Sequence, residues 1–385
     1  MRTLLLLGAQ PDLVRAAPIF AALREFGEDG MLAFTGREED LRPLDALFAD
    51  LQVPRPDFFL EIDPGSHAQQ IVQAMQALEP VTSRLRPDWI VLVGETDAAL
   101  TCAFVLSKLR AEVGFGIAHL ESGVREGDWR VADEANRILM DHLADLLLAP
   151  SYEALAGLTR EGIAKDRVVF VGSMLIDTLF SLLPRAIGLG YPGRFGLLRG
   201  GYVAASLEHP ATLGSPETLR SALEGLARVA EEIPVAVVLP PGGRVRVEEF
   251  GLAGLLDTLC DPRPEGYSEM LSLVEGSGVL ITDSTEMQVM ARGMGIPCVA
   301  LRTRPDRPVT RDRSQRTVLA PLTTEAILAA FREAWAEGRT RPGVHCPEGW
   351  DGRAAMRAVQ ALLFYEPPEA PRAPPPAAAA PTFRN

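Results

Sequence analysis

Cysteine is scarce in this sequence: the 385 residues include only four, Cys102, Cys260, Cys298 and Cys346. They lie too far apart for the Cys-x-x-Cys pairs of zinc sites and redox motifs, and three of them fall inside or beside apolar runs. We therefore expect buried thiols in a reducing compartment, and neither disulfides nor zinc ligands.

Basic residues are also too few for one class of partner. The chain has 38 Lys and Arg against 51 Asp and Glu, a formal net charge of −13. Because nucleic-acid affinity depends above all on neutralising phosphates with Lys and Arg, this balance argues against a nucleic-acid binder. A small anionic ligand held by a few local donors remains compatible with it.

Long apolar runs are missing as well. No segment approaches the roughly 20 uninterrupted apolar residues that a spanning helix requires. The N-terminal run "RTLLLLG" stops at Gly8 and lacks the cleavage site of a signal peptide. We expect no membrane insertion and a cytoplasmic location.

The pattern that is present is an alternation of short apolar runs with amphipathic helical stretches, which predicts βαβ units and parallel sheets. A chain of 385 residues exceeds the size of one hydrophobic core, so two domains are expected. Seven possible strands, from "RTLLLLG" to "RVVFVGS", fit a first doubly wound domain over residues 1–182. A second series, from "YVAASL" to "IPCVALR", fits a second such domain over residues 198–345.

The remaining segments have distinct compositions. The stretch 183–201 is rich in Gly and Pro and is predicted to be the linker. Residues 346–366 are predicted to contain a last helix, and the Pro- and Ala-rich residues 367–385 a disordered tail. The predicted class is α/β, with two Rossmann-like domains facing a cleft.

Several small or polar residues directly follow apolar runs, at what would be the carboxyl ends of parallel strands, where ligands of doubly wound folds bind. We expect them to face one cleft. They are Gly8, Gly94, His119 to Glu121, Gly172, Ser206, Asp283 and Ser284.

Three acidic residues of the first domain meet the same condition: Glu95 ends "IVLVGE", Glu121 ends "GFGIAHLE", and Glu134 starts a helix in "VADEANR". Like charges gathered in a water-poor cleft raise one pKa, which would leave one acid and one base near neutral pH. The plainer alternative is that Glu134 merely favours a helix N-terminus and that Glu121 pairs with Arg125 or Arg137.

Five blocks of the chain, in this order and spacing, resemble the non-hydrolysing UDP-N-acetylglucosamine 2-epimerases, a family with the architecture of B-type glycosyltransferases. The resemblance covers nearly everything up to about residue 345. The blocks are "LGAQPDLVRAAP", "PDWIVLVGETDAALTCAF", "IAHLESGVREGDWRVADEANRILMDHLADLLLAPS", "VVFVGSMLIDTL" and "VLITDSTEMQVMARGMGIPCVALRTRPDRP".

The resemblance implies a reaction. UDP is eliminated from C1 as a proton leaves C2, giving UDP and 2-acetamidoglucal, and UDP adds back after protonation on the other face. This step needs a carboxylate base, a second acid and stabilisation of the departing diphosphate, without a metal or redox cofactor. Glu95 stands where the family has Asp, and Arg125, Asn136 and Arg137 belong to the retained first-domain blocks.

The groups expected to hold UDP depart from the family pattern. Gln10 replaces an Arg and Arg15 a Lys, so a forked cationic donor becomes a neutral amide at position 10. The position of the catalytic His holds Glu208, with His209 one place further on, where an ordinary exposed loop residue is the simpler interpretation.

The second-domain phosphate turn changes most. The family's "DSGG" is here Asp283, Ser284, Thr285 and Glu286, so an anionic side chain stands where bare backbone would approach phosphate. The two glutamates that follow in the family are Val289 and Met290. The remaining candidates for substrate contacts are Arg244, Tyr267, Arg302 and Arg307.

Three hypotheses follow from these patterns. One is an active epimerase in which Arg15, Arg244, Arg302 and Arg307 replace the missing donors. The others are a catalytically silent relative that acts as a binding or regulatory protein, and an enzyme for a different nucleotide sugar, including a B-type glycosyltransferase. We adopt an epimerase acting on a UDP-amino sugar, and expect a homodimer by analogy with the family.

Overall fold

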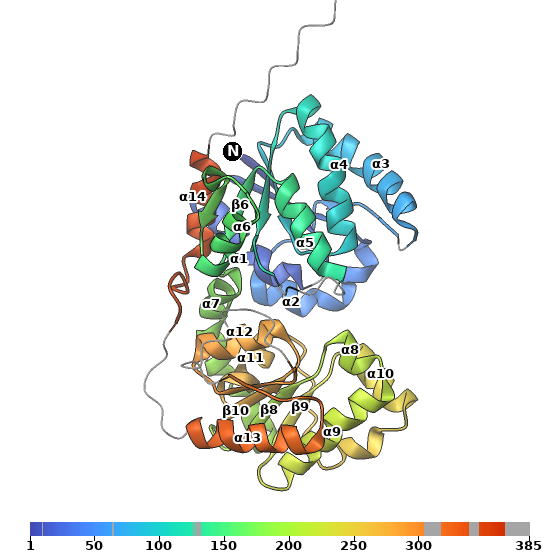
Figure 1. The fold of residues 1–385 in the computed structure, drawn as a ribbon, viewed down its shortest axis with the longest axis vertical. Coiled ribbons are helices and arrows are strands. Elements are labelled where there is room, and N and C mark those ends of the chain that lie inside the picture. Colours follow the sequence, from blue (N-terminus) through green and yellow to red (C-terminus); the bar gives the residue numbers. More distant parts are fainter. Residues whose placement is uncertain are drawn as a thin grey trace, which may run out of the picture.

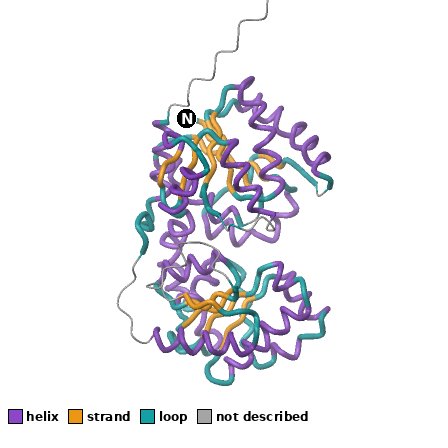
Figure 2. Tube along the Cα trace, viewed as in Figure 1, coloured by secondary structure: helices purple, strands orange, loops and turns teal. Residues whose placement is uncertain are grey.

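The computed structural model describes residues 1–9, 11–63, 65–125, 127, 132–303, 317–338 and 346–365. Figures 1 and 2 show two α/β domains that follow one another along the long axis of the molecule. Each has strands at its centre and helices outside. The predicted fold class, α/β with two parallel doubly wound sheets, is confirmed.

The first sheet contains seven parallel strands in the order β3-β2-β1-β4-β5-β6-β7. Strand order reverses between β1 and β4, and such a switch point opens a crevice at the carboxyl ends of the strands. The strands are β1 (Arg2–Leu7), β2 (Asp29–Phe34), β3 (Phe58–Phe59), β4 (Trp89–Val93), β5 (Gly116–Leu120), β6 (Leu146–Ala149) and β7 (Val168–Phe170).

Helices cover both faces of this sheet, which explains why its strands are apolar throughout rather than alternating. Leu5 and Leu7 point to one face, which is covered by the helix directly after β1 and by the last helix of the chain. Leu4 and Leu6 point to the other face. The helices are α1 (Asp12–Glu25), η1 (Glu38–Leu44), α2 (Asp45–Leu51), α3 (His67–Leu85), α4 (Asp97–Val113), α5 (Ala132–Leu143), α6 (Tyr152–Arg160), η2 (Lys165–Arg167) and α7 (Met174–Leu189).

The second sheet has five parallel strands in the order β12-β11-β10-β8-β9, with its switch point between β10 and β8. The strands are β8 (Val203–Ser206), β9 (Val235–Val238), β10 (Val279–Thr282), β11 (Cys298–Ala300) and β12 (Thr317–Leu319). The helices are η3 (Tyr191–Phe195), α8 (Pro210–Leu213), α9 (Pro216–Ala230), α10 (Pro241–Glu249), η4 (Ala253–Leu256), α11 (Tyr267–Glu275), α12 (Thr285–Met294) and α13 (Thr324–Gly338).

The predicted linker begins too early. Helix α7 continues through Pro184 to Leu189, so the first part of the 183–201 stretch is helical. Its apolar face, which includes Leu182 and Ala186, stays buried against helices of both domains. That burial outweighs the local signals of Gly and Pro, and the connection starts at Gly190.

The chain ends by returning to the first domain. Helix α14 (Ala354–Phe364) packs against α1, and the Trp89 indole donates a hydrogen bond to the Leu362 carbonyl at 3.0 Å. Asp177 of α7 accepts hydrogen bonds from the Ala354 and Ala355 backbone N–H groups and so caps this helix. The predicted last helix is thus present but shorter than 346–366, and the predicted tail lies outside the described residues.

The lengths and compositions of the helices bear on membrane insertion. None of them, within the described ranges, combines the length and the apolar character that crossing a membrane requires.

Candidate active site

The switch point of the first sheet is occupied by Asp12, the first residue of α1. Its Oδ2 accepts hydrogen bonds from the backbone N–H groups of Gly8 (3.1 Å) and Ala9 (2.7 Å). Gly94 is required on the other side, because it has φ +85° and a Cβ there would come within 2.1 Å of Asp12 Oδ2. The two strand-end glycines therefore make room for this carboxyl.

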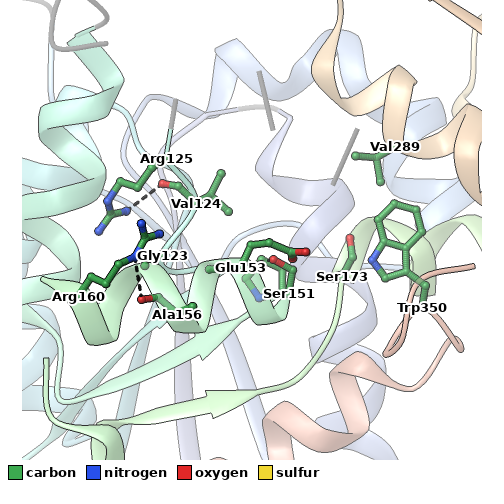
Figure 3. Close-up of a pocket in the computed structure, with 13 residues that line it drawn as sticks. Gly123, Val124, Arg125, Ser151, Glu153, Ala156, Arg160, Ser173, Val289 and Trp350 are labelled. Atoms are coloured by element: carbon green, nitrogen blue, oxygen red, sulfur yellow. Dashed lines mark hydrogen bonds between the residues drawn. The ribbon is translucent and has the colours of Figure 1, made fainter. Parts of the chain in front are cut away.

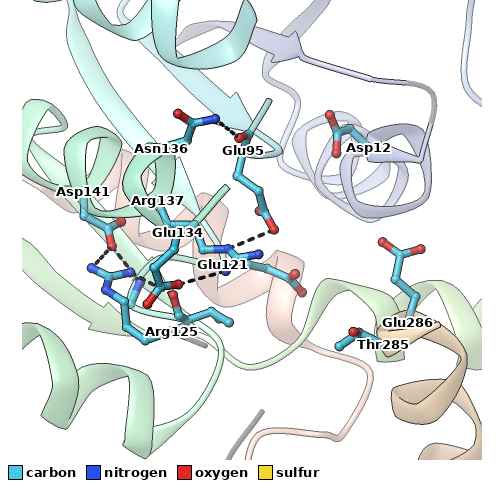
Figure 4. A network of polar contacts seen from close by, with 12 residues as sticks. Asp12, Glu95, Glu121, Arg125, Glu134, Asn136, Arg137, Asp141, Thr285 and Glu286 are labelled. Carbon is cyan, nitrogen blue, oxygen red and sulfur yellow. Dashed lines mark hydrogen bonds and ion pairs between the residues drawn. The ribbon is translucent and has the colours of Figure 1, made fainter. Parts of the chain in front are cut away.

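Arg15 lies one turn further along α1 and is buried among three carboxylates. It pairs with Asp12 at 3.2 Å, with Glu121 at 3.1 Å and with Glu286 at 2.5 Å. Burial by itself would lower the pKa of Arg15, but Glu286, Glu121 and the other acids outweigh it and raise that pKa well above its usual value. Because Glu286 belongs to α12, this ion pair joins the two domains; Figure 4 shows Asp12 and Glu286 reaching toward the same space from opposite sides.

Glu121 follows β5 in a conformation that L residues rarely adopt, with φ +54°. A left-handed non-glycine residue costs about 1–3 kcal/mol and persists only where its surroundings enforce it. Its two carboxylate oxygens face Arg15 Nε and the Ser173 hydroxyl, the latter at 3.4 Å. The alternative pairing of Glu121 with Arg125 or Arg137 is wrong, since both arginines are engaged elsewhere.

Arg137 holds the other two predicted catalytic carboxylates together. Its Nε pairs with Glu95 at 3.1 Å, and its NH1 pairs with Glu134 at 3.0 Å. Glu134 also accepts the Gly127 backbone N–H at 2.9 Å. Asn136 fixes the strand end by donating to the Glu95 carbonyl and to Asp97, both at 2.9 Å. Glu95 keeps 26% of its side chain exposed, against 3% for Glu134, so Glu95 is the more accessible of the two.

Asp12 also belongs to the acidic cluster, although the sequence analysis did not single it out. Burial raises the pKa of Asp12 to about 7, Arg15 and the Ala9 N–H lower it in part, and Glu95 and Glu286 add to the rise. The signal available in the sequence was an acidic residue at the start of a helix that directly follows the first strand.

The second domain contributes the N-terminus of α12, which is capped from within. The Ser284 hydroxyl accepts the Met287 backbone N–H at 3.3 Å. Arg302 donates to the Asp283 carbonyl at 2.9 Å and to the Thr285 hydroxyl at 3.5 Å. Ser284, Thr285 and Arg302 thus stabilise the turn that presents Glu286.

Two further second-domain groups feel the charge of Glu286. Desolvation raises the pKa of Glu208, and the nearby charges of Glu286 and Asp283 add to the rise. A hydrogen bond from Ser284 opposes it. The Tyr267 hydroxyl has no hydrogen-bond partner among the described residues, and burial, with Glu286 and Glu208, raises its pKa well above the usual value. The charge of Glu286 thus disfavours ionisation of both groups.

Other predicted residues do not join this cluster. His209 is half-buried and caps α8, its Nδ1 accepting the Ala211 backbone N–H at 3.1 Å. Arg244 pairs with Asp261 instead of facing the cluster. Gln10 and Arg307 lie outside the described residues.

The expectation that every strand end faces one cleft fails at three places. Ser206 lies within β8 and is buried against the Thr282 hydroxyl at 3.0 Å. His119 lies within β5 and is buried against Asp141. Gly172 packs on the C-terminal segment, where a Cβ would come within 2.2 Å of the Gly349 carbonyl oxygen. Sequence position alone could not show that the chain returns to cover this edge.

A cavity of about 360 Å³ adjoins the cluster on the β6 and β7 side. Figure 3 shows Arg125 and Arg160 at one end and Trp350 beside Val289 of α12 at the other. Ser173, which contacts Glu121, also lines it. The predicted substrate ligand Arg125 is held in its wall by Glu161 and Asp141.

Comparison with known proteins gives this arrangement a context. A family model described as UDP-N-acetylglucosamine 2-epimerase matches residues 23–363. The chain belongs to the UDP-N-acetylglucosamine 2-epimerase family. Its relatives include the UDP-N-acetylglucosamine 2-epimerase of Methanocaldococcus jannaschii, 29% identical over 80% of this chain and 86% of the relative. A Pseudomonas aeruginosa UDP-2,3-diacetamido-2,3-dideoxy-D-glucuronate 2-epimerase is 30% identical over 78% and 83% of the two chains.

Solved structures of this family have the same two-domain fold. The Methanocaldococcus jannaschii epimerase in complex with UDP-GlcNAc and UDP superposes with a TM-score of 0.81 at 26% identity, covering 94% of this chain and all of the other. The Neisseria meningitidis epimerase bound to UDP-GlcNAc also gives 0.81, at 20% identity and with coverage of 94% and 100%. The predicted resemblance and its B-type glycosyltransferase-like architecture are confirmed.

Asp12 makes the unfolding free energy depend on pH. Its pKa of about 7 exceeds the ordinary value of 3.8, so the folded state binds this proton more tightly than the unfolded chain. The resulting stabilisation is complete below about pH 4 and is lost as the pH rises to about 7. We expect Asp12→Asn, which cannot titrate, to gain stability relative to the wild type across that window.

Urea denaturation of both proteins between about pH 4 and pH 9 measures this difference. The difference should level off above about pH 8. A wild-type-to-variant difference that stays constant over the whole range would contradict the raised pKa.

Proposed function

We propose that this protein is a nucleotide-sugar 2-epimerase that interconverts UDP-N-acetylglucosamine and UDP-N-acetylmannosamine by elimination and re-addition of UDP. The observation that carries the proposal is the ion pair of Glu121 with the buried Arg15, at the switch point that meets the α12 N-terminus. Glu95 lies near enough to contribute to the raised pKa of Arg15. Family membership and the activity for which the relatives are named support the same reaction.

The reaction needs two protein groups at C2 and a cation at the diphosphate. In the elimination, a carboxylate removes the C2 proton, the C–H electron pair forms the C1–C2 double bond, and UDP leaves with the C1–O pair. We assign the C2 proton transfers to Glu95 and Glu121, one for each face of the sugar. Glu134 orients Glu95 through Arg137, and Arg15 attracts the diphosphate.

The second domain supplies a neutral donor in this proposal. The Tyr267 hydroxyl, which has no hydrogen-bond partner among the described residues, can donate a hydrogen bond to a diphosphate oxygen without adding another cation. His209, as the cap of α8, has no assigned part in the chemistry. No cofactor or metal enters the proposed steps.

We place the enzyme in the cytoplasm and propose that it is a homodimer. All four cysteines are free thiols, as in reducing compartments. Large apolar side chains are exposed on the adjacent helices α3, α4 and α5 of the first domain, which is typical of an interface. They are Val72, Met75, Phe104 and Leu139.

Proton NMR of the purified protein with UDP-N-acetylglucosamine in D2O tests the function. We expect loss of the C2 proton signal and appearance of the manno epimer. Glu95→Gln removes one acid–base group and should lower kcat by about 10²- to 10⁴-fold. Glu112→Gln, on the exposed end of α4, is the matched control and should retain activity. Absence of exchange at high wild-type concentration would refute the epimerase proposal and favour the silent or different-substrate alternatives.

Glu286 competes with the substrate for Arg15, because its carboxylate occupies the cation that a diphosphate would need. We expect Glu286→Gln to bind UDP on the order of tenfold more tightly, measured by isothermal titration calorimetry. Glu333→Gln on α13 removes the same charge from an exposed position and controls for net charge. Weaker UDP binding by Glu286→Gln than by this control would contradict the competition.

The proposed dimer face can be tested by light scattering after size-exclusion chromatography. We expect a dimer mass for the wild type and a monomer mass for Phe104→Glu, because burying a carboxylate in an apolar contact requires its costly desolvation. Leu198→Glu, which changes an exposed apolar residue in the connection between the domains, should remain a dimer. A monomeric wild type would overturn the proposal.

A further inference from the structure

Asp141 of α5 is a fully buried carboxylate that contacts the segment carrying Glu121 at three points. Its Oδ1 lies 2.6 Å from His119 Nδ1. Its Oδ2 accepts the Gly123 backbone N–H at 3.0 Å and an Arg125 guanidinium N–H at 2.7 Å. Figure 4 shows Asp141 and Arg125 joined by dashed lines to one side of the acidic cluster. The contacts therefore lie on both sides of Glu121, two residues before it and two and four residues after it.

The segment between these contacts needs an external restraint. Glu121 and Gly123 both have positive φ, +54° and +79°, so the chain makes two left-handed steps within three residues. The sheet reaches this segment through the Ser122 backbone N–H, which donates to the Leu148 carbonyl at 3.2 Å. A left-handed glutamate is held only where surrounding contacts over-determine its conformation.

The charge of Asp141 suits this task. Burial would raise its pKa, but His119 and Arg125 outweigh that effect and lower it. An ionised carboxylate only accepts hydrogen bonds, and all three partners can donate. Asparagine at this position would turn an N–H₂ group toward one of the donors and leave that contact unmade.

We propose that Asp141 is a positioning residue for the epimerase reaction. By fixing His119, Gly123 and Arg125, it holds Glu121 in the conformation in which the carboxylate meets Arg15 and Ser173. The expected effect on kcat rests on the proposed function. The restraint that Asp141 places on Glu121 concerns the ligand-free protein and does not depend on that function. Asp141 lies behind the loop and touches no proposed substrate contact other than Arg125.

The test compares Asp141→Asn with Asp145→Asn. Asp145 also accepts a backbone N–H, from Ile117 at 2.9 Å, and pairs with an arginine, Arg110, at 2.6 Å. Its contacts lie at the opposite end of β5, so it reproduces the chemistry of Asp141 away from Glu121. We expect both variants to lower the unfolding free energy, but only Asp141→Asn to lower kcat, by roughly 10²-fold, with little change in KM.

A second variant covers the case in which Asp141→Asn does not fold. His119→Phe keeps an aromatic ring and removes one donor, leaving Asp141 with Gly123 and Arg125. We expect a smaller loss of kcat in the same direction, again with KM nearly unchanged. An unaltered kcat in whichever of these two variants folds, or an equal loss in Asp145→Asn, would overturn the proposal.

Hydrogen–deuterium exchange of the ligand-free proteins separates this inference from the proposed function. We expect the peptide spanning residues 119–125 to exchange faster in Asp141→Asn than in the wild type and Asp145→Asn. If the wild type proves inactive on UDP-N-acetylglucosamine, the proposed function fails, yet the exchange comparison still decides whether Asp141 holds the loop. Unchanged exchange in Asp141→Asn would overturn the inference by itself.

Discussion

The buried guanidinium of Arg15 is the interaction on which this site depends. This single cation pairs with carboxylates from α1, from the end of β5 and from α12, and so connects two domains whose sheets share no strand. Without this cation, the three acids would repel one another in a buried site from which water is largely excluded. In the proposed reaction the same guanidinium also attracts the diphosphate. Assembly of the ligand-free protein and binding of the substrate would then depend on one cation.

The pairing with Arg15 gives a physical reason for the acidic residue Glu286 in the turn before α12. A glycine-rich phosphate turn leaves its cation exposed, whereas a turn that carries Glu286 brings its own anion to Arg15. Glu286 in turn raises the pKa values of Glu208 and Tyr267. In this structure the anion that meets Arg15 therefore comes from the second domain itself.

The sequence predicted the architecture well because apolar runs such as "LLLL" and "IVLV" are buried on both faces only in parallel sheets with helices on either side. It placed Glu95, Glu121 and Glu134 at strand or helix ends for the same reason. The partners of these residues were beyond its reach: the choice of Arg15 for Glu121, and of Arg137 for Glu95, depends on side-chain directions fixed by tertiary packing. Asp12 was missed because a carboxylate at a helix start is common and becomes unusual only when buried. The linker was misplaced because Pro184 and Gly188 signalled a break locally, while burial of α7 against both domains continued the helix.

The return of α14 to the first domain has a consequence for how the two halves can be separated. The α1 surface near Ala16 and Ala17 forms one core with Ala355 and Val359, which lie more than three hundred residues later in the chain. A fragment ended at the connection after Leu189 would contain every strand of the first sheet and still lack part of its hydrophobic core. The first domain is continuous in its sheet but discontinuous in its sequence, so its integrity depends on the chain having passed through the second domain and come back.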